Sequence, residues 1–577
     1  MNLTMRAPLK ASIIGITGWM IVAANLKLLP SAFPGFWVEW PPYHPGQEDE
    51  KIYRFLFSLS KVMGVLLLAL YGLLVADWTG EKKLRATGWL DGYFKKLVAI
   101  IEKNRTIVAQ YNKGIKLIFI LWALLMLTCL LTIPYHYDEA WSYHYFSRHG
   151  WLRTMAFYPL PNNHIFFNLV VVFFTSLPLD PVISTRLPSL LAAFIGSFYF
   201  LKLSRSYFSK NLSLFLTFLL SSTYPFILYG MEGRGYGFLI CFSILQLYAA
   251  NQLALQYGRL KYRLLYFFAF AAGLYTITSH LYFALPIHIL LFVYVLKNKE
   301  GRIFIFDSIK AAFVVIILYW IIVYCNGFKV LLNPNGSVRL DGDKLMPAIW
   351  EHLRNTWFWL TNSHVSPAVI LLLLFAPLAD RILKKRPDYW LNAAVCVLLI
   401  SPPVILFLQR LVFFVRLWTY LIIPIVIGFG FLLNLLAPAV ARLSFLRRLN
   451  RTAFFYPAAF AVLLVVNFSL FIKEHRESFA IDYAIESLFR GIQPEIGTAR
   501  TVYYTRRSLE YYVAEQLVYK QARVNPDRPV EMSAEGTVAG QDILILSPSI
   551  GVKELPQLAN YRLAGSYRDI FSLYTKK

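Results

Sequence analysis

The sequence predicts an all-α protein that crosses the membrane many times and ends in a small α/β domain. Hydrophobic residues make up 57% of the 577 residues and charged residues only 15%, against about a quarter in a soluble chain. Apolar runs long enough to span a bilayer recur along the chain, separated by short basic loops. The final stretch lacks such runs and alternates between strand-like and helix-like patterns.

We expect about 13 transmembrane helices, each built from a run of about 20 apolar residues. The expected spans are 10–30, 56–76, 115–134, 185–203, 212–230, 236–256, 262–280, 282–297, 304–325, 366–384, 390–408, 417–436 and 453–472. The first run lacks a small-residue cleavage site, which favours a membrane anchor over a cleavable signal peptide. All four cysteines lie in apolar runs, so we interpret them as packing residues.

The basic residues set the expected orientation. Lys and Arg collect in the loops 82–116, 202–210, 259–263, 297–302, 381–386 and 442–451. The positive-inside rule places these loops in the cytoplasm, with the N-terminus inside and the C-terminus outside. This distribution accounts for the net charge of +25 without a nucleic-acid partner. The segment 82–116 mixes basic and apolar residues, as in an amphipathic helix on the inner leaflet.

One apolar segment, Ile165 to Leu177, tests this topology. If it crossed the membrane, every later basic loop would lie outside. We therefore predict that it is a short helix packed along the outer membrane surface. The outer loop then runs from 135 to 184 and holds two short helices, which Pro159 and Pro161 separate.

These patterns divide the chain into three parts. They are two N-terminal spans with an amphipathic segment (1–114), a transmembrane core (115–473) and an exoplasmic α/β domain (474–577). In the last part we predict strands at 501–505 and 542–546, a helix at 508–519 and a closing pair of strands within 561–574. No phosphate-binding glycine loop or catalytic triad is evident there, so we expect an accessory or acceptor-recruiting role.

The clearest functional signal is the acidic pair Asp138–Glu139, which closely follows the apolar run ending at Ile133. Carboxylates at a membrane boundary are costly unless they are hydrated or functional. Further polar side chains are expected on the same outer face: His164, Arg186, Arg234, Tyr236, His280 and Arg416. Because the arginine fork matches phosphate oxygens, this combination indicates a general base beside cationic phosphate clamps.

Each of these residues also has a structural explanation. The acidic pair would stabilise the start of a helix through its dipole. Arg186, Arg234 and Arg416 could extend to lipid head groups of the outer leaflet. Paired acids could hold a divalent metal ion, although the histidines between His136 and His164 follow no regular metal-binding spacing.

Taken in order, the motifs resemble the GT-C superfamily of integral-membrane glycosyltransferases. Within it, residues 115–470 are most similar to the branch of the protein O-mannosyltransferases and the lipid A aminoarabinose transferases. The shared features are an exoplasmic Asp-Glu pair, Pro-Asn-Asn-His before a second surface helix, Arg-Leu-Pro-Ser at the next span, Glu-x-Arg-x-Tyr and a Ser-His turn. Two extra spans precede the core, and Arg416-Leu417-Trp418 stands where an Arg-Tyr pair is common.

The resemblance implies transfer of a sugar from a polyprenyl-phosphate carrier on the periplasmic or exterior face of the plasma (inner) membrane, usually with inversion. It implies that Asp138 is the catalytic acidic residue and Glu139 its neighbour. It also implies that Arg186 lies near the carrier phosphate and that Arg234 and Tyr236 form the Arg-x-Tyr pattern.

The residue chemistry supports the same hypothesis. A carboxylate that accepts the proton of an acceptor hydroxyl accelerates attack by about 10²–10⁴-fold, and a phosphate leaving group needs only charge stabilisation. We therefore predict Asp138 as base, Glu139 as its partner, and Arg186 and Arg234 as clamps.

Three alternatives stay open: a lipid or glycan transporter or flippase, a non-catalytic lipid-binding subunit, and an O-antigen ligase or polymerase. A transporter usually has internal repeats and polar groups near mid-membrane, and neither is evident here. The sugar, and whether the acceptor is a glycan, a lipid or a protein, are not determined by the sequence.

Overall fold

The computed structural model describes residues 113–577, with gaps of which the longest are 327–337, 441–454, 505–530, 534–540 and 547–555. The two expected N-terminal spans, and all but the last few residues of the expected amphipathic segment, lie outside the described residues.

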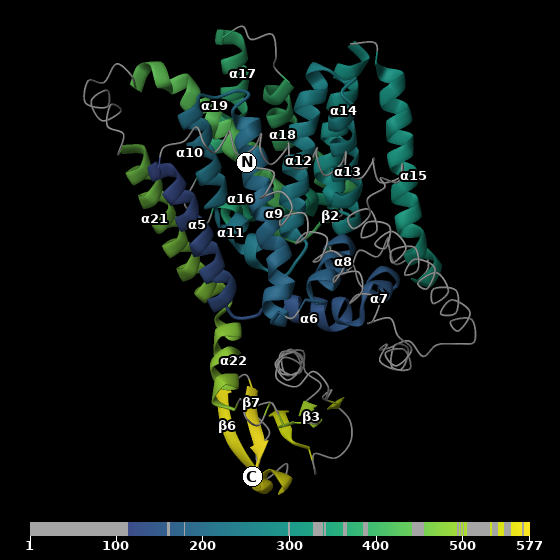
Figure 1. Cartoon of the computed structure of the whole chain (residues 1–577), viewed down its shortest axis with the longest axis vertical. Helices are drawn as coiled ribbons and strands as arrows, with labels where there is room; N and C mark the ends of the chain where they lie inside the picture. Colours follow the sequence, from purple (N-terminus) through teal and green to yellow (C-terminus); the bar gives the residue numbers. More distant parts are fainter. Residues whose placement is uncertain are drawn as a thin grey trace, which may run out of the picture.

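The core is a bundle of long apolar helices that run side by side (Figure 1). Within the described ranges, seven segments are long and apolar enough to cross a membrane: α5 (Lys113–Thr132), α9 (Pro181–Ser204), α12 (Tyr236–Leu255), α14 (His280–Lys297), α15 (Gly301–Asn326), α18 (Trp390–Gln409) and the run Val415–Ala437. That run joins the 3₁₀ helix η5 (Val415–Leu421) to α19 (Ile422–Val440). Three further helices of the bundle are α13 (Leu260–Thr276), α17 (Val369–Lys384) and α21 (Phe455–Ser478). The predicted fold class, an all-α protein with many helices that can span a membrane, is confirmed. The total of 13 spans stays a prediction.

The expected span 212–230 is broken in two. The helices α10 (Lys210–Ser221) and α11 (Tyr224–Met231) meet at an angle of 64°. Pro225 lies in the first turn of α11, where its missing amide hydrogen is tolerated, whereas it would disrupt the middle of a longer helix. The bend directs the end of α11 toward the glycine-rich segment 232–236.

Short helices gather at one end of the bundle (Figure 1). They are α6 (Tyr137–Tyr145), η2 (Ser147–His149), α7 (Trp151–Ala156) and α8 (Ile165–Phe174). A helix of ten residues is about 15 Å long, half the thickness of a bilayer core. The prediction of a short helix at 165–177 is therefore confirmed. Phe167 and Val171 bury its apolar face against α9 and α12.

Two helices were not predicted, α16 in the bundle and α22 (Ala480–Gly491) after it. The amphipathic α16 (Leu345–Thr361) lies between α15 and α17 in the chain and buries Ile349, Trp357 and Leu360. Its His352 accepts a hydrogen bond of 3.0 Å from Trp418 Nε1 in η5. A short antiparallel pair, β1 (Val338–Arg339) with β2 (Leu411–Val412), forms nearby. Together these contacts hold the loop that carries Arg416.

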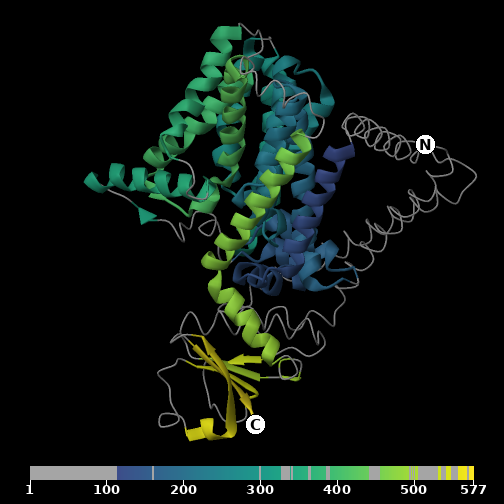
Figure 2. The same cartoon turned by 90° about the vertical axis from the view of Figure 1, so that its left-hand side faces the viewer.

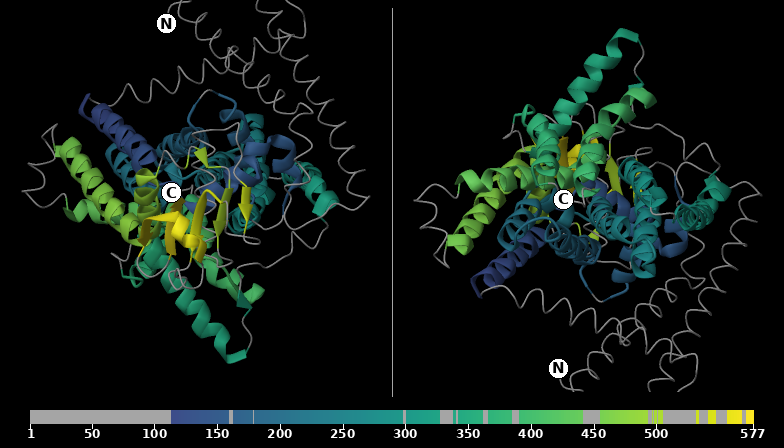
Figure 3. Two further views of the ribbon diagram at one scale, coloured as in Figure 1. Left: turned by 90° about the horizontal axis from the view of Figure 1, so that it is seen from below. Right: turned by 90° about the horizontal axis from the view of Figure 1, so that it is seen from above.

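The C-terminal part forms a five-stranded sheet in the order β4-β3-β5-β7-β6. The strands are β3 (Thr501–Tyr504), β4 (Glu531–Ser533), β5 (Ile543–Leu546), β6 (Tyr561–Tyr567) and β7 (Phe571–Lys576). β3 pairs in parallel with β4 and β5, and β7 pairs antiparallel with β5 and β6. From below, the sheet lies in front of the bundle (Figure 3). The predicted strands are confirmed, β4 was not predicted, and the predicted helix 508–519 lies outside the described residues.

The bundle and the sheet are joined by helices. α21 runs without a break past residue 473, the expected domain boundary, to Ser478, and α22 (Ala480–Gly491) begins directly after Phe479. α22 buries Ile485 and Phe489 against Val502 and Ile543 of the sheet. Figure 2 shows this helix pair leading from the bundle to the strands.

Candidate active site

The candidate site forms where the first turn of α6 meets α9, the segment 232–236 and η5. Each of these segments contributes one charged residue or more, and three arginines face two carboxylates. The five side chains alone therefore carry an excess of one positive charge, which favours an anionic ligand such as a phosphate.

Glu139 and Arg186 form a buried bidentate ion pair. Arg186 Nε donates to Glu139 Oε1 at 2.8 Å and Nη2 donates to Oε2 at 2.6 Å. The other guanidinium hydrogens go to the carbonyls of Leu130, Ile133 and Pro134 at 2.8–3.0 Å. All five N–H donors of Arg186 are thus used inside the protein, and its side chain is 1% exposed. This geometry does not fit the predicted direct contact of Arg186 with a phosphate.

The Glu139 carboxylate is equally saturated. Besides the two bonds from Arg186, it accepts the backbone amide of His136 at 2.9 Å and the amide of Gly233. The first of these bonds completes a capping box at the start of α6. Glu139 therefore ties α6 to α9 and to the glycine-rich segment. It lies next to Asp138, but both of its carboxylate oxygens already accept hydrogen bonds from the protein and neither is available to a substrate.

Asp138 is partly open. Its Oδ2 accepts a hydrogen bond of 2.9 Å from Arg416 Nη1 and lies 3.5 Å from Arg234 Nη2. Among the described residues, none donates a hydrogen bond to Oδ1, and the side chain is 15% exposed. Burial alone would raise the pKa of this carboxyl, but Arg234, His136 and Arg416 hold the pKa well below its usual range. Asp138 is therefore ionised at neutral pH and has one oxygen available to accept a proton.

Arg234 fixes the helix that carries Asp138. Its Nη1 donates to the Asp138 carbonyl at 3.0 Å and to Ser142 Oγ at 2.9 Å. Its Nη2 donates to Asn162 Oδ1, and the side chain is 1% exposed. The structure places Arg234 next to Asp138. Most of its N–H groups donate hydrogen bonds to residues of the loop 135–184.

Arg416 is the most accessible of the three arginines. Its side chain is 32% exposed, and only Nη1 has a hydrogen-bond acceptor among the described residues. The buried Nε has none. The guanidinium packs over the rings of Tyr236 and Phe414 at 5.8 and 4.7 Å, contacts that hold an arginine while leaving its N–H groups free. Of the three arginines, Arg416 thus has the most N–H groups without an acceptor among the described residues.

His164 lies behind this cluster as a neutral ring. The amide of Gly235 donates to His164 Nδ1 at 2.8 Å, so the proton of the neutral imidazole is on Nε2. Burial, with Arg234 and Arg416 nearby, lowers the pKa of His164 well below its usual value. Its ring packs edge to face on Tyr236 at 5.0 Å. His164 and Tyr236, both predicted as site residues, therefore lie at the site and pack against each other in its wall.

Gly235 has no room for a side chain. A Cβ there would lie 2.8 Å from His164 Cβ and from Thr276 Cγ2. We expect Gly235→Ala to lower the stability of the protein by about 1–3 kcal/mol, the usual effect of overpacking, measured as thermal unfolding in detergent. Gly491→Ala, at a position with nothing within 4 Å of the added Cβ, is the matched control. Equal melting temperatures for the two variants would contradict this packing.

His280 does not join the cluster. It is fully buried in the bundle, where its Nε2 lies 2.9 Å from Gln246 Oε1 and its ring fills the space above Gly273. None of its hydrogen bonds or ring contacts in the described chain reaches the acidic pair. The prediction that His280 binds substrate is not supported by this position, because a bundle core offers no access.

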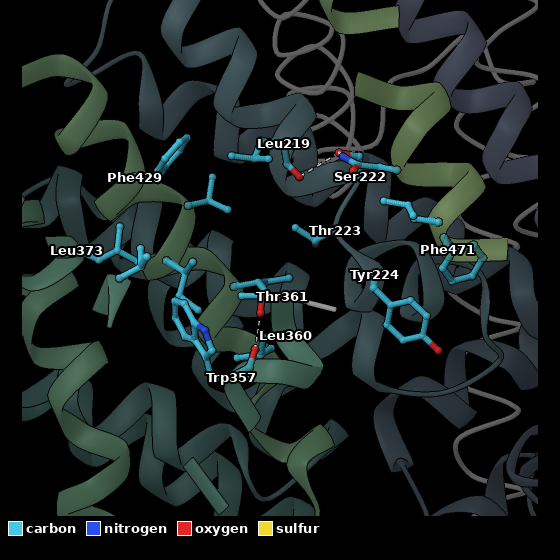
Figure 4. Close-up of a pocket in the computed structure, with 16 residues that line it drawn as sticks. Leu219, Ser222, Thr223, Tyr224, Trp357, Leu360, Thr361, Leu373, Phe429 and Phe471 are labelled. Atoms are coloured by element: carbon cyan, nitrogen blue, oxygen red, sulfur yellow. Dashed lines mark hydrogen bonds between the residues drawn. The ribbon is translucent and has the colours of Figure 1, made fainter. Parts of the chain in front are cut away.

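Two hollows adjoin the site. The aromatic cleft has a volume of about 360 Å³ and contains Arg416, Glu232 and Glu474 among aromatic rings that include Tyr236 and Trp359. The apolar cavity has a volume of about 320 Å³ and lies between α10, α16, α17, α19 and α21. Figure 4 shows Trp357, Leu373, Phe429 and Phe471 around this cavity. Tyr224, in the first turn of α11, lines both.

The residues present do not suit a divalent metal ion. In the described part of the chain, no group of three or more His, Cys, Asp or Glu side chains has a metal-binding arrangement. Both oxygens of Glu139 are taken by N–H donors, and Asp138 faces two arginines. A hard cation requires several free oxygen ligands, which this pair does not supply.

Sequence reasoning missed the contribution of the C-terminal helices. Glu474, Ser478 and Phe479 of the α21–α22 junction line the aromatic cleft. Ser142 was also missed, although it holds Arg234. The charged run after the last expected span was assigned to the C-terminal domain, and nothing local to it indicates that it returns to the site.

No protein-family model matches the sequence, and no curated protein matches it. Solved structures of similar fold include two of one protein, ArnT. The crystal structure of ArnT from Cupriavidus metallidurans bound to undecaprenyl phosphate superimposes with a TM-score of 0.51 at 15% sequence identity, over 80% of this chain and 98% of that one. The apo structure of the same protein gives a TM-score of 0.48 at 14% identity, over 79% and 97%. The first of these superpositions shows that the chain has the fold of ArnT.

Proposed function

We propose that the protein transfers a sugar from a polyprenyl-phosphate carrier to an acceptor hydroxyl, with Asp138 as general base and Arg416 as the main phosphate-binding arginine. The observation that carries this proposal is the contact of 2.9 Å between Asp138 Oδ2 and Arg416 Nη1 at the edge of the aromatic cleft. It joins a base to a cation that has unused donors. ArnT, which shares the fold, was crystallised with undecaprenyl phosphate.

The two hollows suit the two halves of such a donor. The apolar cavity is lined mainly by hydrocarbon and aromatic side chains of the bundle, which suit an isoprenoid tail. The aromatic cleft combines rings with two carboxylates and a guanidinium, groups that pack on sugar rings and hydrogen-bond to hydroxyls. A donor laid across Tyr224 would therefore place its phosphate between tail and sugar, near Arg416.

Donor binding would also activate the base. In the free site, Arg416 holds Asp138 Oδ2 and helps to lower the pKa of that carboxyl. A phosphate that binds Arg416 through a donor that Asp138 does not use brings negative charge next to Asp138. Nearby negative charge raises the pKa of a carboxyl, so the carboxylate becomes a stronger base when the donor is in place.

The reaction balances with these groups alone. The acceptor oxygen attacks C1 of the sugar and forms the new glycosidic bond, while its proton passes to Asp138. The bond between C1 and the phosphate oxygen breaks, and its electron pair stays with the polyprenyl phosphate. Arg416 stabilises that developing charge. A single displacement of this kind inverts the configuration at C1.

The function is tested by sugar transfer from the carrier in a defined bilayer. Purified protein in nanodiscs would receive undecaprenyl-phosphate-linked radiolabelled sugars together with a membrane extract as acceptor source. We expect labelled product and an equal amount of free undecaprenyl phosphate, with inverted configuration at C1 by NMR. Movement of a fluorescent carrier lipid across vesicles, with no bond broken, would instead indicate a flippase.

Arg416 provides a prediction specific to this assignment. Arg416→Gln is expected to lower the transfer rate by about 10²-fold, the effect of losing one donor to a developing anion. Arg416→Lys keeps the charge but loses the planar fork, so an intermediate rate is expected. Initial rates at saturating donor are the measurement.

The matched control for Arg416 is Arg410→Gln, an exposed arginine at the end of α18 in the same outer loop. It should retain the wild-type rate. If Arg416→Gln and Arg410→Gln transfer sugar equally well, the phosphate-binding role belongs to another residue.

A further inference from the structure

A histidine joins the start of α6 to the C-terminal helices. His136 is the N-cap residue of α6, two residues before Asp138. Its Nδ1 lies 3.5 Å from Glu232 Oε1, just after α11, and its Nε2 lies 4.0 Å from Asp482 Oδ2 on α22. Its ring packs edge to face on Phe479 at 4.8 Å. One imidazole thus connects three segments that are far apart in the chain.

The surroundings favour a charged imidazole. Asp482 and Glu232 are 3% and 9% exposed, and buried carboxylates require cationic or hydrogen-bonding partners. Burial alone would lower the pKa of His136, but Glu232, Asp482 and Asp138 raise it to about 9. His136 is therefore an imidazolium at neutral pH, and it contributes in turn to the lowered pKa of Asp138.

Protonation of the His136 ring determines which of two neighbouring groups Nδ1 can hydrogen-bond. This atom lies 3.3 Å from the amide nitrogen of Asp138 and 3.5 Å from Glu232. A protonated Nδ1 donates to the carboxylate and cannot accept the amide. The cap of α6 is then maintained by Glu139, which accepts the amide of His136.

The charged and titratable groups near the ring come from five elements. They are Asp138 and Glu139 of α6, Glu232 after α11, Asp482 of α22, His475 of α21, which stacks on Phe479, and Arg186 of α9 on the far side of Glu139. Carboxylates outnumber the cations among them, and Asp482 is the one supplied by the C-terminal α/β domain.

We propose that Asp482 is a positioning residue for catalysis, acting through His136 to hold the first turn of α6 and its Asp138 at the aromatic cleft. The inference rests on the proposed role of Asp138. It extends that role to a domain that the sequence predicted to be accessory. Since α22 packs Ile485 and Phe489 into the core of the sheet, the C-terminal domain becomes a structural part of the active site.

The test is the pH dependence of sugar transfer. The raised pKa means that the imidazolium contact is complete at neutral pH and is lost as the pH rises through about 9. Asp482→Asn removes one of the carboxylates that raise this pKa, so the alkaline loss of activity should move to lower pH by about one unit. Glu486→Gln, one turn further along α22, is the matched control and should keep the wild-type profile.

A second variant keeps the test independent of simple misfolding. His136→Gln has no ring to titrate, so its alkaline loss of activity should disappear, and adding Asp482→Asn to it should have no further effect on the profile. Wild-type profiles in both single variants would overturn the proposal. So would an additive effect in the double variant, because it would show that Asp482 acts without His136.

Titration of His136 itself separates this inference from the proposed function. Labelling the ten histidines with ¹³C at Cε1 and assigning the His136 signal with His136→Gln gives its midpoint in nanodiscs. We expect a midpoint near 9 that falls by about one unit in Asp482→Asn. If wild-type protein transfers no sugar, the proposed function fails while this shift still tests the contact. An unchanged midpoint overturns the contact even in an active enzyme.

Discussion

Replacing Asp138 with Asn is expected to lower the rate of sugar transfer by about 10²–10⁴-fold, the usual contribution of a general base. The amide keeps the shape of the side chain but cannot accept the acceptor proton as the glycosidic bond forms. Because the Asp138 side chain is partly open and asparagine keeps its shape, the fold should be retained. Transfer rates and melting temperatures in nanodiscs, measured on the same preparations, are the data required.

Asp180→Asn is the matched control for this variant. Asp180 lies in the same outer loop and caps α9 by accepting the amide of Val182 at 2.8 Å. Asparagine caps helices as well as aspartate does, so both rate and stability should stay near wild type. Should Asp138→Asn transfer sugar within a few-fold of the control, another group must take the proton.

Glu139→Gln is expected to lower the stability of the protein more than it impairs the catalytic step. The amide leaves Arg186 buried without a counter-charge, and breaking a buried ion pair in this way destabilises proteins by about 3–5 kcal/mol. The effect should appear in unfolding of the detergent-solubilised protein. Glu486→Gln breaks an exposed pair with Arg490 on α22, for which only about 0.3–0.5 kcal/mol is expected.

A double variant separates the buried charge from the lost hydrogen bonds. Glu139→Gln combined with Arg186→Met removes both charges, so it should be less destabilised than the sum of the two single variants, by a coupling of about 0.5–3 kcal/mol. Strict additivity would indicate that Glu139 and Arg186 do not form the ion pair.

Much of the fold could be predicted from the sequence, because apolar length and basic loops are local signals. The segment 165–177 was predicted from the parity of the basic loops alone to be a short helix that does not span the membrane, and the structure has a helix of ten residues there. The helix α16 was missed because its apolar stripe is interrupted by charged residues and is too short to read as a span. The bend between α10 and α11 was also missed, although Pro225 indicates a helix start.

For the site, residue types were easier to predict than roles. Asp138 and Glu139 are adjacent and chemically alike, yet the Asp138 side chain is partly exposed and the Glu139 carboxylate is saturated with hydrogen bonds. The distinction depends on Arg186, which bonds Glu139 and also carbonyls at the end of α5, such as that of Leu130. These groups come from segments far apart in the chain, so no local sequence pattern predicts the contact. For the same reason Arg186 was predicted as a phosphate clamp, whereas the free donors belong to Arg416.

The bend at Tyr224 has a consequence for how variants of this protein would behave. This residue borders both the apolar cavity and the aromatic cleft, so the two hollows share part of one wall at the bend between α10 and α11. Substitutions at Tyr224 or Pro225 should therefore change the preferred length of the carrier chain and the preferred sugar at the same time. Selectivity for the two ends of the donor would then evolve jointly, as a single trait.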